Sequence, residues 1–318
     1  MTATRKPLSR HDLTPLARAA LGRTPVSAIR LRGGSKKGVY RLAFDDGSTA
    51  IAYVWSADED YWDAGPSDLR DPFAHGTGLD LFTAAHVRLA AAGVRTPRLL
   101  HVDADAGQAV VEDLPGESLE AALDREPALL DRLAALLATL HSHTGPRFGK
   151  VALVDNGGSS YGTSCEQRVL EGALRDIEEV SGREPRAAAV RERLVERVRE
   201  LAARVRPRDR HTLIHGELGP DHVLLTPDRE LALIDIEGLL YFDVEWEHAF
   251  LELRFGPGYE TLRVPGLDED RLRFYRLAMH LSLVAGPLRL LDGDFPDPEF
   301  MRGIAEHNLG RVLDLLGR

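Results

Sequence analysis

The sequence "LIHGELGPDHVLL", Leu213–Leu225, is followed a few residues later by "LIDIEG", Leu233–Gly238. Both stretches contain apolar, strand-like runs with carboxylates at their ends, and the first also contains histidines. From the letters alone, three interpretations are open. The pair is a phosphotransferase catalytic loop, a metal site of another kind, or a polar hairpin that caps strands and does no chemistry.

The spacing of the acidic residues favours the first interpretation. Phosphoryl transfer needs a carboxylate near the attacking hydroxyl and a divalent ion held against the phosphates by protein side chains. It also needs cationic or backbone N–H groups around those phosphates. Glu217 follows the turn at His215, His222 lies five residues after Glu217, and Asp235 ends the next apolar run. We therefore take these residues as candidates for the chemistry.

A second motif, "RGGSKKGVYRL" at residues 32–42, joins two strand-like runs. Glycines allow a backbone to approach a phosphate closely, and a serine hydroxyl can donate a hydrogen bond to it. Lysine occurs only at Lys6, Lys36, Lys37 and Lys150, so the adjacent pair is conspicuous. The candidate phosphate-binding residues of this loop are Gly33, Gly34, Ser35, Lys36 and Lys37. Two solvated lysines at a hairpin tip are the alternative.

The chain around these motifs predicts two lobes. Short β-rich runs at residues 26–32, 38–44, 49–55, 98–103 and 108–114 predict a small antiparallel sheet, and residues 79–93 predict one helix within it. After residue 117 the apolar spacing becomes helical, as at 127–143, 186–205 and from 244 onward. The predicted class is α+β, with an N-terminal lobe at 1–111, a connector at 112–116 and a larger helical lobe at 117–318.

Composition restricts the function classes. The net charge of −10 argues against nucleic-acid binding, which depends on a cationic surface. Cys165 is the only cysteine, so the chain has no intrachain disulfide and no thiolate-rich zinc site, and we expect this thiol to be inert. No apolar run approaches the about 20 residues that span a bilayer, and no secretory signal is evident. We expect a cytoplasmic enzyme without a membrane partner.

Several segments together resemble the aminoglycoside phosphotransferase superfamily, which includes choline-kinase-like members. The loop of that family reads His-Gly-Asp with Asn five positions after the Asp, and its next motif is Ile-Asp with further acids. "IDIEGLLYFDVEWEHAF", residues 234–250, aligns with that second motif without a gap. Residues 90–123 and "LHSHTGPRFG", residues 140–149, are also similar to family segments. The resemblance covers about Ser27 to Phe250 and implies a protein-kinase-like two-lobe fold.

The resemblance also implies roles for the candidates. Glu217 would be the base for the acceptor hydroxyl, on a loop ordered by His215. Asp235 and His222 would hold Mg²⁺ or Mn²⁺, and the glycine loop would contact the phosphates of ATP. The backbone of the connector would bind adenine, through Glu112, Asp113 and Leu114.

Three positions depart from the family pattern. Glu217 stands for the catalytic Asp, His222 stands for the Asn, and Tyr53 stands where the strand lysine that reaches the phosphates is expected. The helix at 79–93 offers Asp80 but no glutamate as a partner for such a lysine. Protein kinases known as with-no-lysine kinases supply this lysine from a different strand near the glycine loop. Lys36 or Lys37 is therefore the expected replacement.

The sequence thus predicts an ATP-dependent phosphotransferase that acts on a hydroxyl of a small molecule. We expect the acidic residues Glu237, Glu245 and Glu247 to shape the acceptor site, and Asp243 to be structural. A nucleotide-binding pseudokinase that regulates a protein partner is the first alternative, and a kinase of a peptide Ser/Thr is the second. A metal-dependent hydrolase is disfavoured, because the spacing from His215 to His222 does not suit two ligands on one helix.

Overall fold

The computed structural model describes residues 5–62, 68–74 and 76–317. The chain forms two compact units that are assembled from discontinuous segments. Unit 1 comprises Met1–Gly65, His75–Arg132 and Pro220–Gly238, and unit 2 comprises Pro66–Ala74, Leu133–Gly219 and Leu239–Arg318. The segment that carries Asp235 therefore folds with the N-terminal sheet, whereas the segment that carries Glu217 folds with the helices. The lobe boundaries at 111 and 117 stay a prediction.

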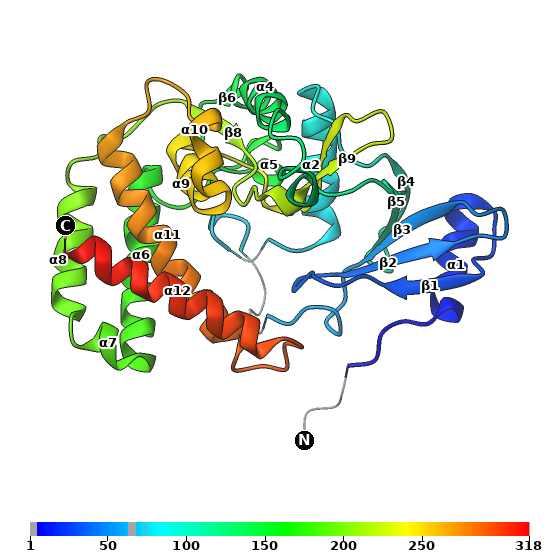
Figure 1. Cartoon of the computed structure of the whole chain (residues 1–318), viewed down its shortest axis with the longest axis horizontal. Coiled ribbons are helices and arrows are strands. Elements are labelled where there is room, and N and C mark those ends of the chain that lie inside the picture. Colours follow the sequence, from blue (N-terminus) through cyan, green and yellow to red (C-terminus); the bar gives the residue numbers. More distant parts are fainter. Residues whose placement is uncertain (1–4, 63–67, 75, 318) are drawn as a thin grey trace. The chain divides into compact units, whose positions relative to one another are not determined.

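The sheet of unit 1 contains each strand that the sequence predicts. Its strands are antiparallel neighbours in the order β1-β2-β3-β5-β4, and β1 to β3 can be followed in Figure 1. The bounds are β1 Ser27–Arg30, β2 Gly38–Ala43, β3 Thr49–Val54, β4 Leu99–Asp103 and β5 Gln108–Glu112. Burial alternates along β2, as expected for a strand with one covered face.

Helix α1, Arg10–Leu21, covers part of this sheet and was not among the predicted elements. Its start is a capping box, because Ser9 accepts from the backbone of Asp12 and the Asp12 carboxylate accepts from the backbone of Ser9. Gly22 ends it with a φ of 69°. Leu13 and Leu16 are buried in the same apolar cluster as Tyr40 of β2, so α1 completes the core of the sheet.

A short hairpin brings the acidic motif into unit 1. The remaining elements of this unit are α2 Leu79–Ala91, α3 Leu119–Ala122, η1 Pro220–His222, β9 Val223–Leu225, β10 Leu231–Leu233 and η2 Ile236–Gly238. The Leu225 amide donates to the carbonyl of Glu117, and the Leu233 amide donates to the carbonyl of Arg95. These bonds attach the hairpin to the segments on either side of β4 and β5. Helix α4, Leu129–His141, continues into unit 2.

Unit 2 combines a small antiparallel sheet with a helical core. The sheet order is β6-β8-β11-β7, with β6 Thr144–Gly145, β7 Gly149–Lys150, β8 His211–Ile214 and β11 Leu240–Phe242. The helices are α5 Val151–Val154, α6 Cys165–Arg183, α7 Pro185–Ala188, α8 Arg191–Ala202, α9 Val244–Phe255, η3 Gly256–Gly258, α10 Tyr259–Leu262, α11 Glu269–Leu290 and α12 Pro298–Leu316.

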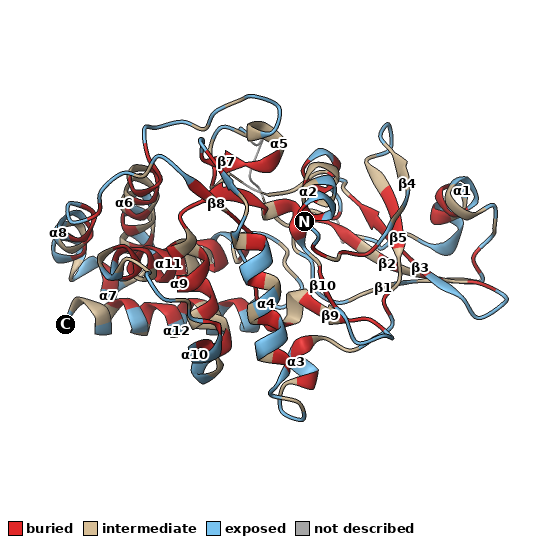
Figure 2. Cartoon of the chain, turned by 90° about the horizontal axis from the view of Figure 1, so that it is seen from above, coloured by how far each residue is buried: buried red, intermediate tan, exposed pale blue. Residues whose placement is uncertain are grey.

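Helix α11 is the centre of this core and packs against α6, α8, α9 and α12. Figure 2 shows α9 and α11 as mostly buried, whereas α8 has an exposed face. Most residues of α11 are buried, as expected for a helix that other helices cover on most of its sides. Among the described residues, no helix combines the length and the apolar character that crossing a membrane requires.

Candidate active site

The hairpin β9–β10 places His222 beside Asp235. Leu233 pairs with Val223, and the amide of Ile234 donates to the carbonyl of His222 at 3.0 Å. His222 Nε2 lies 3.8 Å from Asp235 Oδ2, and 3.7 Å from a carboxylate oxygen of Asp221. The structure therefore brings together the imidazole and the carboxylate that the sequence nominates as metal ligands.

Asp235 has a strained backbone. Its φ is 58°, in the left-handed region that costs a non-glycine residue roughly 1–2 kcal/mol. Such strain tends to be kept where a side chain must point in a functional direction. The side chain is 41% exposed, so one of its oxygens can meet a ligand from solvent.

Lys37 is buried against two carboxylates. Its Nζ lies 2.7 Å from Asp235 Oδ1 and 2.6 Å from Glu237 Oε1, and its side chain is only 8% exposed. The ammonium also lies 5.3 Å from the ring centroid of Tyr53, a distance at which a cation is attracted to the ring face. The lysine of the glycine loop thus lies over the ring of Tyr53, the residue that the sequence resemblance places at the strand-lysine position.

Electrostatics keeps Lys37 and Asp235 ionised. Burial by itself lowers the pKa of Lys37, but the charges of Asp235 and Glu237 outweigh it and raise that pKa above its usual value. The same ammonium holds the pKa of Asp235 well below its usual range. Two carboxylates around one ammonium leave a net negative charge, which suits a further cation beside Asp235.

Asp235 and His222 offer two of the ligands that a divalent ion needs. Lys37 takes Asp235 Oδ1, while Oδ2 is the oxygen that faces His222. A carboxylate paired with an imidazole suits Mn²⁺ better than Mg²⁺, which prefers oxygen ligands. Asp235 and His222 are thus the residues that could hold such an ion.

The glycine loop is held by side chains from beyond β3. Ser35 accepts a hydrogen bond from the indole of Trp62 at 2.8 Å, and the carbonyl of Lys36 accepts from Thr77 at 2.8 Å. Gly33 and Gly34 have φ values of 87° and 74°, which only glycine adopts without strain. The loop therefore has a defined path that turns Lys37 inward.

The connector is fixed by ion pairs. Glu112 accepts from Arg95 at 2.6 Å, and Asp113 accepts two hydrogen bonds from Arg41, at 2.7 and 3.1 Å. The amide of Glu112 donates to the carbonyl of Arg98, so it is used inside the sheet. The adenine contacts at Glu112, Asp113 and Leu114 stay a prediction.

In unit 2, β8 leads directly into the His-Gly-Glu loop. His215 is fully buried and Gly216 has a φ of 91°, whereas Glu217 is exposed between buried neighbours. The amide of Gly216 donates to Glu247 of α9 at 2.8 Å. Because Glu247 is 0% exposed, burial raises its pKa to about 7, although hydrogen bonds from Gly216 and His215 oppose that rise. Glu247 thus anchors the turn that presents Glu217.

The expectation that Glu237, Glu245 and Glu247 shape an acceptor site is wrong. All three carboxyl groups are buried, with exposures of 4%, 0% and 0%. The carboxylate of Glu245 accepts hydrogen bonds from both terminal nitrogens of the Arg208 guanidinium, each at 2.7 Å. The signal that sequence reasoning missed is the apolar character of the neighbouring residues, which predicts that these acids point inward and need internal partners.

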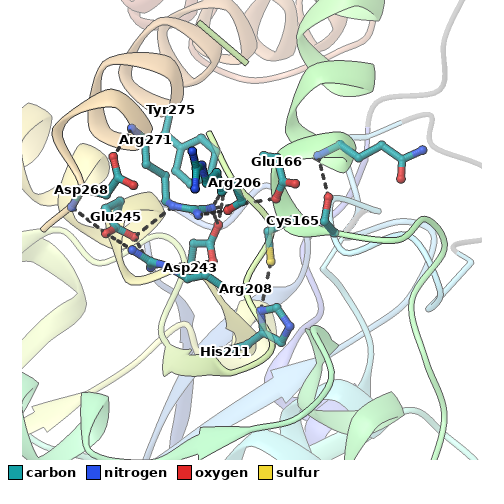
Figure 3. Close-up of polar contacts among 12 residues, drawn as sticks. Cys165, Glu166, Arg206, Arg208, His211, Asp243, Glu245, Asp268, Arg271 and Tyr275 are labelled. Carbon is teal, nitrogen blue, oxygen red and sulfur yellow. Dashed lines mark hydrogen bonds and ion pairs between the residues drawn. The ribbon is translucent and has the colours of Figure 1, made fainter. Parts of the chain in front are cut away.

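Asp243 is structural, as expected, and organises a buried network in unit 2 (Figure 3). Arg271 and Tyr275 of α11 both donate to its Oδ2, and Asp243 is 2% exposed. Cys165 Sγ lies 3.4 Å from His211 Nδ1 beside this network. Burial raises the pKa of the thiol, and the charge of Asp243 adds to the rise. Cys165 is therefore a protonated, enclosed thiol, in agreement with its predicted inertness.

Comparisons with known proteins cover most of the chain. Residues 69–277 match the sequence model of the family described as "Phosphotransferase enzyme family". No curated protein matches the chain.

Solved structures with a similar fold include a thermostable mutant of the aminoglycoside phosphotransferase APH(4)-Ia, with 18% identity, 94% of this chain and 98% of that chain covered, and a TM-score of 0.64. They also include the choline kinase LicA from Streptococcus pneumoniae, with 15% identity, coverage of 96% and 97%, and a TM-score of 0.64. A choline/ethanolamine kinase family protein from Mesorhizobium loti has 20% identity, coverage of 96% and 95%, and a TM-score of 0.61. At these identities the likeness concerns the fold, and it confirms the predicted α+β, protein-kinase-like class.

Proposed function

Because the chain belongs to the phosphotransferase enzyme family, we propose that it is an ATP-dependent kinase that phosphorylates a hydroxyl group of a small molecule. The observation that carries this proposal is the buried contact between Lys37 and Asp235. A cation from the glycine loop lies beside the expected metal-binding acid, and these are two kinds of group that a phosphate site needs. Tyr53 cannot supply that charge, because a phenol is either neutral or negative, and burial raises its pKa to about 12 so that it stays neutral.

The ligands of similar folds support the nucleotide and the acceptor class. One solved structure of APH(4)-Ia is a ternary complex with ADP and hygromycin B, and one structure of LicA is a complex with AMP. We extend this to the present chain as ATP and a hydroxyl-bearing small molecule. A cytoplasmic location, where ATP is available, is part of the same proposal.

The proposed reaction assigns one task to each side chain. The acceptor oxygen attacks the γ-phosphorus, its proton passes to Glu217, and the bond to the β–γ bridging oxygen breaks so that ADP leaves with the electron pair. Asp235 and His222 would hold the divalent ion, which would offset the negative charge of the phosphates. Lys37 donates to a phosphate oxygen. Buried Glu247 keeps the turn at Gly216 in place while Glu217 meets the acceptor.

The first experiment measures nucleotide binding by calorimetry with ATP and with adenosine, in Mg²⁺ and in Mn²⁺. A charge-assisted hydrogen bond is worth about 1.5–3 kcal/mol. Lys37→Met should therefore lower the affinity for ATP about tenfold or more and leave the affinity for adenosine unchanged. Lys36→Met is the matched control from the same loop and should change either affinity less than threefold. Asp235→Asn should abolish the metal-dependent part of ATP binding. Equal losses for ATP and adenosine would contradict the assignment of Lys37.

A pseudokinase remains the second candidate, favoured by Tyr53 at the strand-lysine position and by the ion pair that occupies Asp235 Oδ1. The two functions differ in turnover. A kinase should release ADP with at least one member of a panel of aminoglycosides, choline-like alcohols, sugars and Ser/Thr peptides. ATP binding without ADP release and without metal dependence would identify the pseudokinase, and release with peptides alone would identify a peptide kinase.

A further inference from the structure

Glu237 is a buried acid whose role is not explained by metal binding. It is 4% exposed, and Lys37 is the cation that contacts it, at 2.6 Å from Oε1. Among the described residues, neither Oε1 nor Oε2 has a hydrogen-bond partner, so the ion pair with Lys37 is the contact that compensates the charge. A carboxylate in such a place is costly unless a charge compensates it. Its presence therefore calls for a reason beyond packing.

The position of Glu237 offers that reason. Helix α2, which in the resembling fold would supply a glutamate to hold the strand lysine, has only Asp80 as an acid, and Asp80 is exposed. The 3₁₀ turn η2, which carries Glu237, packs against α2. Glu237 therefore reaches the lysine from a neighbouring element on the same side as α2.

The lysine likewise arrives from a neighbouring element. Val39 of β2 is the cross-strand partner of Tyr53 in β3, and Lys37 lies two residues before Val39. Its ammonium lies 5.3 Å from the Tyr53 ring centroid. In the resembling fold the lysine would lie on β3 and the glutamate on α2. Here the lysine comes from the loop before β2 and the glutamate from η2, but the ammonium still lies near residue 53.

We propose that Glu237 is the positioning residue for Lys37 and that the Lys37–Glu237 pair replaces the strand-lysine and helix-glutamate pair of the fold. A lysine ammonium has three N–H donors. Asp235 Oδ1 accepts one of them at 2.7 Å, and Glu237 Oε1 holds the ammonium through an ion pair at 2.6 Å, so the third donor can point to a phosphate of ATP. Glu237 fixes the direction of that third donor, so its effect on the nucleotide acts through Lys37. This inference rests on the proposed ATP-binding function.

The test is a double-mutant cycle on the full chain, with ATP and adenosine as probes in calorimetry. Glu237→Gln should lower the affinity for ATP about tenfold and change the affinity for adenosine less than twofold. In the Lys37→Met background the same change should have little further effect, because the group that it orients is gone. Glu237→Asp keeps the negative charge but withdraws it by one methylene, so it should lose less affinity for ATP than Glu237→Gln does. Asp80→Asn is the matched acid control on α2 and should bind ATP like the wild type.

The outcomes separate this inference from the proposed function. Equal weakening of ATP and adenosine by Glu237→Gln, or a full additional loss in the Lys37→Met background, would show a merely structural acid and overturn the inference. So would a loss in Asp80→Asn that equals the loss in Glu237→Gln. If Lys37→Met loses ATP while Glu237→Gln binds it normally, only this inference fails. A wild-type chain that binds no ATP overturns both.

Discussion

The buried carboxyl of Glu247 should make the stability of this protein depend on pH in an unusual direction. Glu247 is 0% exposed, and its carboxylate accepts from the amide of Gly216 at 2.8 Å. Burial raises its pKa from 4.5 to about 7. Glu247→Gln is the informative change, because an amide oxygen can still accept from Gly216 but cannot ionise.

The expected magnitude follows from the two pKa values. Raising a pKa from 4.5 to about 7 corresponds to about 3 kcal/mol between the protonation states. Between these pH values the folded state binds the proton and the unfolded state does not, so the free energy of unfolding falls as pH rises. The contribution of Glu247 is therefore fully present below pH 4.5 and is lost as pH rises through about 7. The glutamine variant lacks this loss.

Urea unfolding followed by tryptophan fluorescence at pH 5 and pH 8 measures the effect. The difference in free energy of unfolding between Glu247→Gln and the wild type should shift in favour of the variant by up to about 3 kcal/mol when the pH is raised from 5 to 8. The matched control is Glu252→Gln on the same helix, since Glu252 forms a partly exposed ion pair with Arg276 that is worth about 0–1 kcal/mol. The reasoning is refuted if the difference between wild type and Glu247→Gln is the same at both pH values.

Two further changes test the structure through the free energy of unfolding. Arg271→Met should cost about 3–5 kcal/mol because it leaves the carboxylate of Asp243 buried without its guanidinium, whereas Arg273→Met, at an exposed site on the same helix, should cost less than about 1 kcal/mol. Equal effects of the two arginine changes in urea unfolding would contradict this. Gly116→Ala should cost more than about 2 kcal/mol, because the new Cβ would lie 1.7 Å from the carbonyl oxygen of Leu225; thermal unfolding within a degree of wild type would contradict it.

Local order was predictable from the sequence because it depends on neighbouring residues. The β-rich runs at residues 38–44 and 49–55 predict two strands of one antiparallel sheet, and the structure contains them as the paired strands β2 and β3. The helix at 79–93 and the sheet strands up to Glu112 are also confirmed. Helix α1 was missed, although Ser9 and Asp12 have the spacing of a capping box. That signal is short and lies outside the resemblance to the family.

The sequence by itself determined the family, the fold class and the candidates Glu217, His222 and Asp235, since spacing along the chain carries that information. Only the tertiary structure decided which lysine turns inward and which acid meets it. Lys37 and Asp235 are 198 positions apart, and no periodicity relates residues at that distance. Burial decided the role of Glu237. Whether it is a surface acid or the partner of a lysine depends on the elements packed around it.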